Sequence, residues 1–254
     1  NDGTIPSHYH GTHVAGTVGA RGNNNLGVVG VNWDVKIMAI AGSSSSTSTI
    51  SIAYGYALDQ KTIWLESDGE FGANVVATNS SFGIDYADCT SGSYPVWNDL
   101  YNAMGEVGIL SAAATINSNQ NVDVIGDVPT GCDSDYIISV TNTNDDDEKA
   151  NSGYGALSID LGAPGTQILS TANGGGTTTL TGTSMATPHV AGAVGLLHAA
   201  ASVELAQLYL TDPGETALTI KQAILDNVDP LPALDGITVT GGRLNLHSAV
   251  SAVM

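Results

Sequence analysis

Ser184 has the surroundings best suited to nucleophilic chemistry. It follows a polar, glycine-rich approach (residues 173–183) and opens an apolar run, a pattern that predicts a buried helix beginning near it. Pro188 is compatible with that helix only in its first turn. A serine at a helix start lies near backbone N–H groups without helical acceptors and near the positive end of the helix dipole. Those donors can hold the oxyanion of an acyl-transfer intermediate formed on Ser184. The alternative is a helix cap beside closely packed glycine and alanine.

A second stretch with chemistry-bearing residues lies near the start of the chain. Residues 9–17 read YHGTHVAGT, and the small side chains after His10 place this histidine at the start of a helix. Together with the stretch around Ser184, it closely resembles the subtilisin-like serine proteases (subtilases). HGTHVAG, from position 10, matches the family's histidine motif, and GTSMATPH, from position 182, matches its serine motif. The similarity runs from about His8 to the C-terminus, in the family's order.

The resemblance implies a serine endopeptidase that acts on peptide or protein substrates through an acyl-enzyme on Ser184. His10 is then the general base that later protonates the leaving amine. A capping or packing role is the alternative for His10. We expect His13 to be structural, packed or hydrogen-bonded behind the site.

Two further segments resemble the family's substrate-binding parts. Residues 73–83 run from a strand into a segment similar to the Ser-Leu-Gly wall, with Ser81, Phe82 and Gly83 at its positions. The family follows its next strand with Ala-Gly-Asn, whose asparagine donates to the oxyanion. This chain has Ala-Thr-Ile-Asn from position 114, so Asn117 matches only if one residue is inserted. A loop asparagine without a catalytic role is an equally open interpretation of Asn117.

Residues 22–31 resemble the loop with which many subtilases hold a structural calcium. The Asn24 side chain and the Leu26 and Val28 carbonyls offer the oxygen ligands that calcium takes. In the family, a carboxylate and another ligand come from segments before the histidine motif. The alternative is a Gly/Asn turn leading to a strand. No redox or organic cofactor is implied.

One member of the family's Asp-His-Ser catalytic triad, the aspartate, has no match in this sequence. The family order is Asp, then His, then Ser. Asp2 is the only carboxylate before His10, but it lies in a turn signal and too close to His10. We therefore expect an upstream segment of the same protein, possibly a separate cleaved chain, to supply a central strand and the aspartate. On this interpretation, residues 1–254 are a single subtilase catalytic domain that is incomplete at its N-terminus.

The elements that must position these residues alternate between strands and helices. Short apolar runs predict buried strands at residues 35–40, 109–114 and 136–140. Apolar residues at helical spacing predict helices at residues 50–64, 97–107 and 219–228, with Gly108 as a stop. This alternation predicts an α/β fold, a mostly parallel doubly wound sheet flanked by helices, with its sites at the carboxyl ends of strands.

Composition narrows the class of function. The net charge of −19, from 25 acidic and 6 basic residues, argues against nucleic-acid binding. No window of eighteen apolar residues suggests a membrane span. Cys89 and Cys132 lie in polar, turn-rich segments, which favours a disulfide in a secreted protein over two free thiols.

Two other functions compete with the protease. A non-catalytic subtilase-fold protein that binds peptides or serves as a scaffold fits the irregular Thr115-Ile116 and the absent aspartate. A lipase-type α/β hydrolase does not fit, because it needs a Gly-x-Ser-x-Gly elbow and a histidine after its serine.

Overall fold

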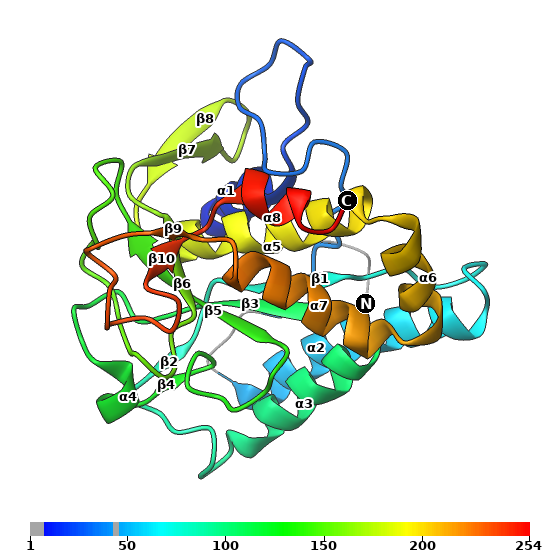
Figure 1. Cartoon of the computed structure of the whole chain (residues 1–254), viewed down its shortest axis with the longest axis horizontal. Coiled ribbons are helices and arrows are strands. Elements are labelled where there is room, and N and C mark those ends of the chain that lie inside the picture. Colours follow the sequence, from blue (N-terminus) through cyan, green and yellow to red (C-terminus); the bar gives the residue numbers. More distant parts are fainter. Residues whose placement is uncertain (1–7, 43–45) are drawn as a thin grey trace.

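The computed structural model describes residues 8–42 and 46–254 as a layered α/β structure (Figure 1). Its six-stranded sheet has the order β1-β3-β5-β6-β10-β9. The strands are β1 (Ala77–Ser80), β3 (Leu110–Ala114), β5 (Ile137–Thr143), β6 (Leu161–Pro164), β9 (Asp229–Pro230) and β10 (Gly242–Arg243). All neighbours pair parallel except β9 and β10, so the expected mostly parallel α/β sheet is confirmed.

Helices cover both faces of this sheet, because its strands have buried apolar side chains on both faces, as β3 illustrates. Its side chains alternate, so Leu110 and Ala112 enter one core while Ala113 enters the other. The first core is covered by α5 (Thr183–Ala200), α7 (Pro213–Leu225) and α8 (Leu246–Ser251), and the second by α2 (Thr47–Glu66) and α3 (Pro95–Glu106). Figure 1 shows α5 on one side of the strands and α2 and α3 on the other.

The remaining elements are short and lie around this frame. They are helices α1 (Tyr9–Gly19), α4 (Val122–Ile125) and α6 (Val203–Thr211), the antiparallel pair β2 (Ile84–Asp85) and β4 (Asp127–Val128), and the hairpin β7 (Ile168–Thr171) and β8 (Thr177–Leu180). The helix predicted at residues 97–107 is confirmed as α3, and Gly108 ends it with a φ of 90°. Among the described residues, no single helix is long and apolar enough to cross a membrane; α5 and α6 pass that test only as a pair bent by 106°.

The strand predicted at residues 35–40 is absent from the structure, so this prediction was wrong. The segment belongs to no sheet, and Ile37, Met38 and Ile40 are 45%, 36% and 38% exposed. An apolar run becomes a buried strand only where a neighbouring strand accepts its backbone hydrogen bonds. Strand β1 pairs only with β3 within the described ranges, which leaves β1 as an edge of the sheet.

The predicted disulfide joins Cys89 and Cys132, with their Cα atoms 5.1 Å apart. It links the segment after β2 to the segment after β4, and Cys89 is buried in the second core. Closing a loop with a sequence separation of 43 stabilises the fold by about 4 kcal/mol in the chain-entropy model. The bridge therefore reinforces the pairing of β2 with β4.

A buried amine sits between α2 and α6. Lys61 is fully buried, donates a hydrogen bond of 2.6 Å to the Asn74 side-chain oxygen, and also donates to the Tyr209 hydroxyl. Its ammonium lies 4.4 Å from the Tyr209 ring centroid and 5.1 Å from that of Trp64. Burial lowers the pKa of Lys61 from 10.5 to about 7, because no carboxylate offsets the loss of solvation.

This amine predicts a rise in stability with pH. Between about pH 7 and 10 the unfolded chain keeps the Lys61 proton while the folded chain has lost it. The unfolded state then binds more protons, so the free energy of unfolding increases by up to ~1.4 kcal/mol per pH unit. Urea unfolding at pH 7.5, 8.5 and 9.5 measures this slope. In the Lys61→Met variant, the free energy of unfolding should rise less with pH than in the protein that keeps Lys61. Equal slopes in the two proteins would contradict the lowered pKa of Lys61.

Candidate active site

The start of α5 is fixed by side chains from the loop after β3. The Thr183 backbone N–H donates to Asn117 Oδ1 at 2.9 Å, and the Thr183 hydroxyl donates to the Thr115 carbonyl at 2.6 Å. Asn117 therefore caps the helix from a distant part of the sequence. Ser184 follows as the second helical residue, in the turn whose N–H groups have no intrahelical acceptor.

Pro188 lies further along its helix than the first turn, where the sequence predicts it. Since α5 begins at Thr183, Pro188 is its sixth residue and falls outside the first turn. Proline has no N–H, so the carbonyl four residues earlier, that of Ser184, loses its helical partner. The Ser81 hydroxyl donates to that carbonyl at 2.9 Å and replaces the missing bond.

This contact also places Ser81 directly against the nucleophile candidate. The Ser184 hydroxyl donates in return to the Ser81 carbonyl at 3.3 Å. Phe82 and Gly83, which follow Ser81, line a cavity of about 60 Å³ whose other wall is formed by residues 114–117. The structure thus brings the predicted wall, Asn117 and Ser184 together around one cavity.

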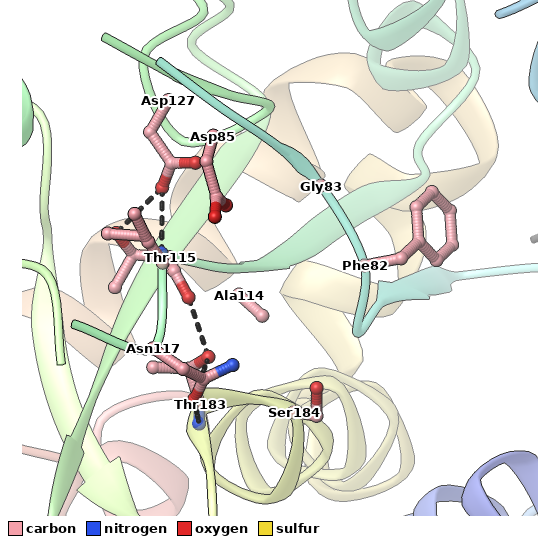
Figure 2. A pocket seen from close by; sticks show the side chains of 10 residues that line it. Phe82, Gly83, Asp85, Ala114, Thr115, Asn117, Asp127, Thr183 and Ser184 are labelled. Carbon is pink, nitrogen blue, oxygen red and sulfur yellow. Dashed lines mark hydrogen bonds between the residues drawn. The ribbon is translucent and has the colours of Figure 1, made fainter. Parts of the chain in front are cut away.

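Figure 2 shows how Asn117 is oriented in that cavity. Its oxygen bonds Thr183, and its amide nitrogen points away from that bond, toward the side where Ser184 lies. The nitrogen makes no hydrogen bond with the described residues, so it is available to a ligand. The placement agrees with an oxyanion donor, although that role stays a prediction.

His10 is the second residue of α1, a helix that packs against α5 and β7. Burial lowers the pKa of His10, and the charges of His8 and His13 lower it further, which favours the neutral form of the ring that a general base needs. Within the described residues, His10 forms no hydrogen bond to Ser184 and none to a carboxylate. Asp2 lies outside the described residues.

His13 has the structural role expected of it. It is fully buried, and its Nε2 lies 2.9 Å from the Ile168 carbonyl, which requires the proton to be on that nitrogen. The bond ties α1 to β7 behind His10.

The predicted calcium ligands lie on an exposed loop. Asn24 Oδ1 accepts a hydrogen bond of 3.0 Å from the Leu26 backbone, and Leu26 is 74% exposed. With the Val28 carbonyl, the loop supplies three oxygens of the six to eight that calcium takes. Within the described ranges, no group of three or more His, Cys, Asp or Glu side chains could hold a metal ion.

Sequence reasoning missed two carboxylates that line the same cavity, Asp85 and Asp127. Strands β2 and β4 pair so that these residues lie opposite each other. Asp127 is 1% exposed, and its Oδ2 accepts hydrogen bonds from the Thr115 and Thr130 hydroxyls and from the Ile116 N–H. The sequence offered one indication of this pair, since Asp85 lies two positions after Gly83 of the predicted wall. No nearby sequence feature indicates that Asp85 lies opposite Asp127.

The hydrogen bonds to Asp127 explain why the loop at residues 114–117 departs from the family pattern. Thr115 and Ile116, which depart from the family pattern, are two of the three residues that hold this carboxylate. The unusual residues therefore belong to the wall of the cavity.

Comparisons with known proteins agree on one family. The model of the subtilase family matches residues 2–241. An extracellular protease of Xanthomonas campestris pathovar campestris is 29% identical over 98% of this chain, and subtilisin Savinase of Lederbergia lenta is 36% identical over 74% of it. The chain spans 41% of the length of the first relative and 62% of the second. Among solved structures, proteases from Pseudoalteromonas arctica align over 99% of this chain and 74% of theirs, with 26% identity and a TM-score of 0.74.

Proposed function

The chain belongs to the subtilase family of serine proteases, and from that premise we propose that it is an endopeptidase working through an acyl-enzyme on Ser184. The observation that carries the proposal is the meeting of Ser184, Asn117 and the wall at residues 81–83 around one cavity. Relatives named proteases support the same function.

In the proposed reaction, Ser184 Oγ leaves the Ser81 carbonyl and attacks the substrate carbonyl carbon. His10 takes the hydroxyl proton and returns it to the nitrogen of the leaving amine, and water then hydrolyses the acyl-enzyme. The lowered pKa of His10 keeps the ring ready to accept that proton. The Ser184 N–H and the Asn117 amide nitrogen hold the oxyanion. The first belongs to the first turn of α5, and the second to the side chain that caps this turn.

We also propose that an aspartate from an upstream segment orients His10. Three features support this idea: among the described residues His10 has no carboxylate partner, β1 has a strand on one side only, and the apolar segment at residues 35–40 is exposed. A strand added beside β1 would satisfy its free backbone groups. The domain would then be complete only with that segment, present in the same chain or as a separate cleaved one.

Secretion and calcium belong to the same proposal. The Cys89–Cys132 disulfide suits an oxidising compartment, and a relative is named an extracellular protease. We propose a structural calcium at Asn24, Leu26 and Val28, with its remaining ligands supplied by the upstream segment.

Active-site labelling tests the enzyme against the non-catalytic scaffold. We expect a fluorophosphonate to label the intact protein on Ser184 alone, because only a serine activated by a base reacts. Ser184→Ala is the control and should remain unlabelled. An intact, folded protein that is not labelled would favour the peptide-binding or scaffold function.

Asn117→Asp tests the oxyanion role without removing the helix cap. A carboxylate oxygen can still accept the Thr183 N–H, while the donor to the oxyanion is lost. We expect kcat to fall by about 10²–10³, the loss known for the equivalent donor in subtilisin, with little change in Tm. An unchanged kcat, measured on a peptide amide, would assign Asn117 to the loop alone.

The upstream segment and the calcium can be tested on the same sample. We expect mass spectrometry of the active protein to find a further segment bearing an aspartate, and melting curves to show a higher Tm in calcium than in chelator. Binding to the native state alone adds about 2.7 kcal/mol at a free calcium concentration of 100 times Kd. Activity from residues 1–254 alone would rule out the segment, and equal Tm values would rule out the metal.

A further inference from the structure

The cavity beside Ser184 contains two acidic side chains from β2 and β4. Asp85 and Asp127 are direct partners in the antiparallel pair, and both line the cavity. In Figure 2 their carboxylates lie next to each other, across the cavity from Ser184. Like charges placed directly opposite on paired strands destabilise the pair, so this arrangement carries a cost that some partner should offset.

Asp127 presents an acceptor to the cavity. All three of its side-chain hydrogen bonds, from Thr115, Ile116 and Thr130 at 2.7 to 3.0 Å, reach Oδ2. Its other oxygen, Oδ1, accepts none from the described residues, although the residue is 1% exposed. Three donors therefore hold the carboxylate in one orientation while its second oxygen remains free for a ligand.

Among the described residues, no cation forms an ion pair with either carboxylate. The six basic residues all lie in the described ranges, and the ion pairs formed there join Arg243 to Asp147 and Asp229 only. Burial raises the pKa of Asp127 and the charge of Asp85 adds to the rise, while the three hydrogen bonds oppose it. A positive group in the cavity would favour the ionised form of Asp127.

We propose that this cavity receives the substrate side chain just before the scissile bond, and that Asp127 and Asp85 select lysine or arginine there. The inference rests on the proposed protease function. A carbonyl held between Ser184 and Asn117 carries its own side chain into the cavity that those two residues line. The aliphatic part of that side chain passes Phe82 and Ala114, and its N–H donors reach Asp127 Oδ1 and the Asp85 carboxylate.

The composition of the chain is consistent with such a preference. Only Arg21 and Lys36, of the six basic residues, are exposed outside helices and strands. A protease that cleaves after basic residues would find few sites on its own surface. The net charge of −19 would in addition attract basic substrates.

The experiment uses the intact protein and peptide amides that differ only in the residue before the scissile bond, with Lys, Arg and Leu compared by kcat/KM. We expect Lys or Arg to exceed Leu by on the order of 10²-fold, the range that a buried charge pair supplies. Asp127→Asn, at the buried carboxylate, should reduce that ratio by at least about tenfold. Asp85→Asn, at an exposed one, should reduce it by about two- to fivefold. The exposed Asp235→Asn, a charge-matched control away from the cavity, should leave the ratio unchanged.

The protease function and the preference for basic residues give different results when each is wrong. If Ser184 is labelled by fluorophosphonate but Lys, Arg and Leu peptides are cleaved equally, the protease stands and this inference is overturned. A basic preference that survives both Asp85→Asn and Asp127→Asn overturns it as well, and Asp85→Asn keeps the test valid if Asp127→Asn fails to fold. Absence of labelling overturns the proposed function and the inference with it.

Discussion

The hydrogen bonds between Thr183 and the loop after β3 determine where α5 begins, and much of the site depends on that point. Two bonds, to Asn117 Oδ1 and to the Thr115 carbonyl, join the helix to a segment more than sixty residues away in sequence. Each contributes about 1 kcal/mol to stability. Their geometric effect is larger, because one asparagine side chain caps the helix with its oxygen and aims its nitrogen at the cavity.

The same short loop also holds the opposite wall of the cavity. Thr115 and Ile116 bind the buried carboxylate of Asp127, while Asn117 binds the start of the helix. A loop of three residues therefore connects the start of α5, where Ser184 lies, to the acidic end of the pocket. The Cys89–Cys132 bridge strengthens this arrangement, because it joins the segments that follow β2 and β4.

On the other side of the site, the His10 side chain makes no hydrogen bond with the described residues and is held there by packing. Its helix lies against α5, and His13 anchors that helix to β7, but among the described residues no carboxylate orients the His10 ring. Within the described ranges, β1 is an edge of the sheet, and residues 35–40 form an apolar segment with exposed side chains. The upstream segment proposed above would give β1 a partner and His10 a carboxylate.

The sequence by itself determined the family, the α/β alternation, helix α3 with its stop at Gly108, and the identity of Ser184 and His10 as candidates, and it favoured the disulfide over two free thiols. These follow from local motifs and hydrophobic periods, which neighbouring residues specify. The sequence could not place residues 35–40, because an apolar run forms a strand only where a neighbour pairs with it. It also could not decide the orientation of Asn117 or join Asp85 to Asp127. Those contacts cross long sequence separations, and only the tertiary packing of β2, β4 and α5 brings their side chains to one cavity.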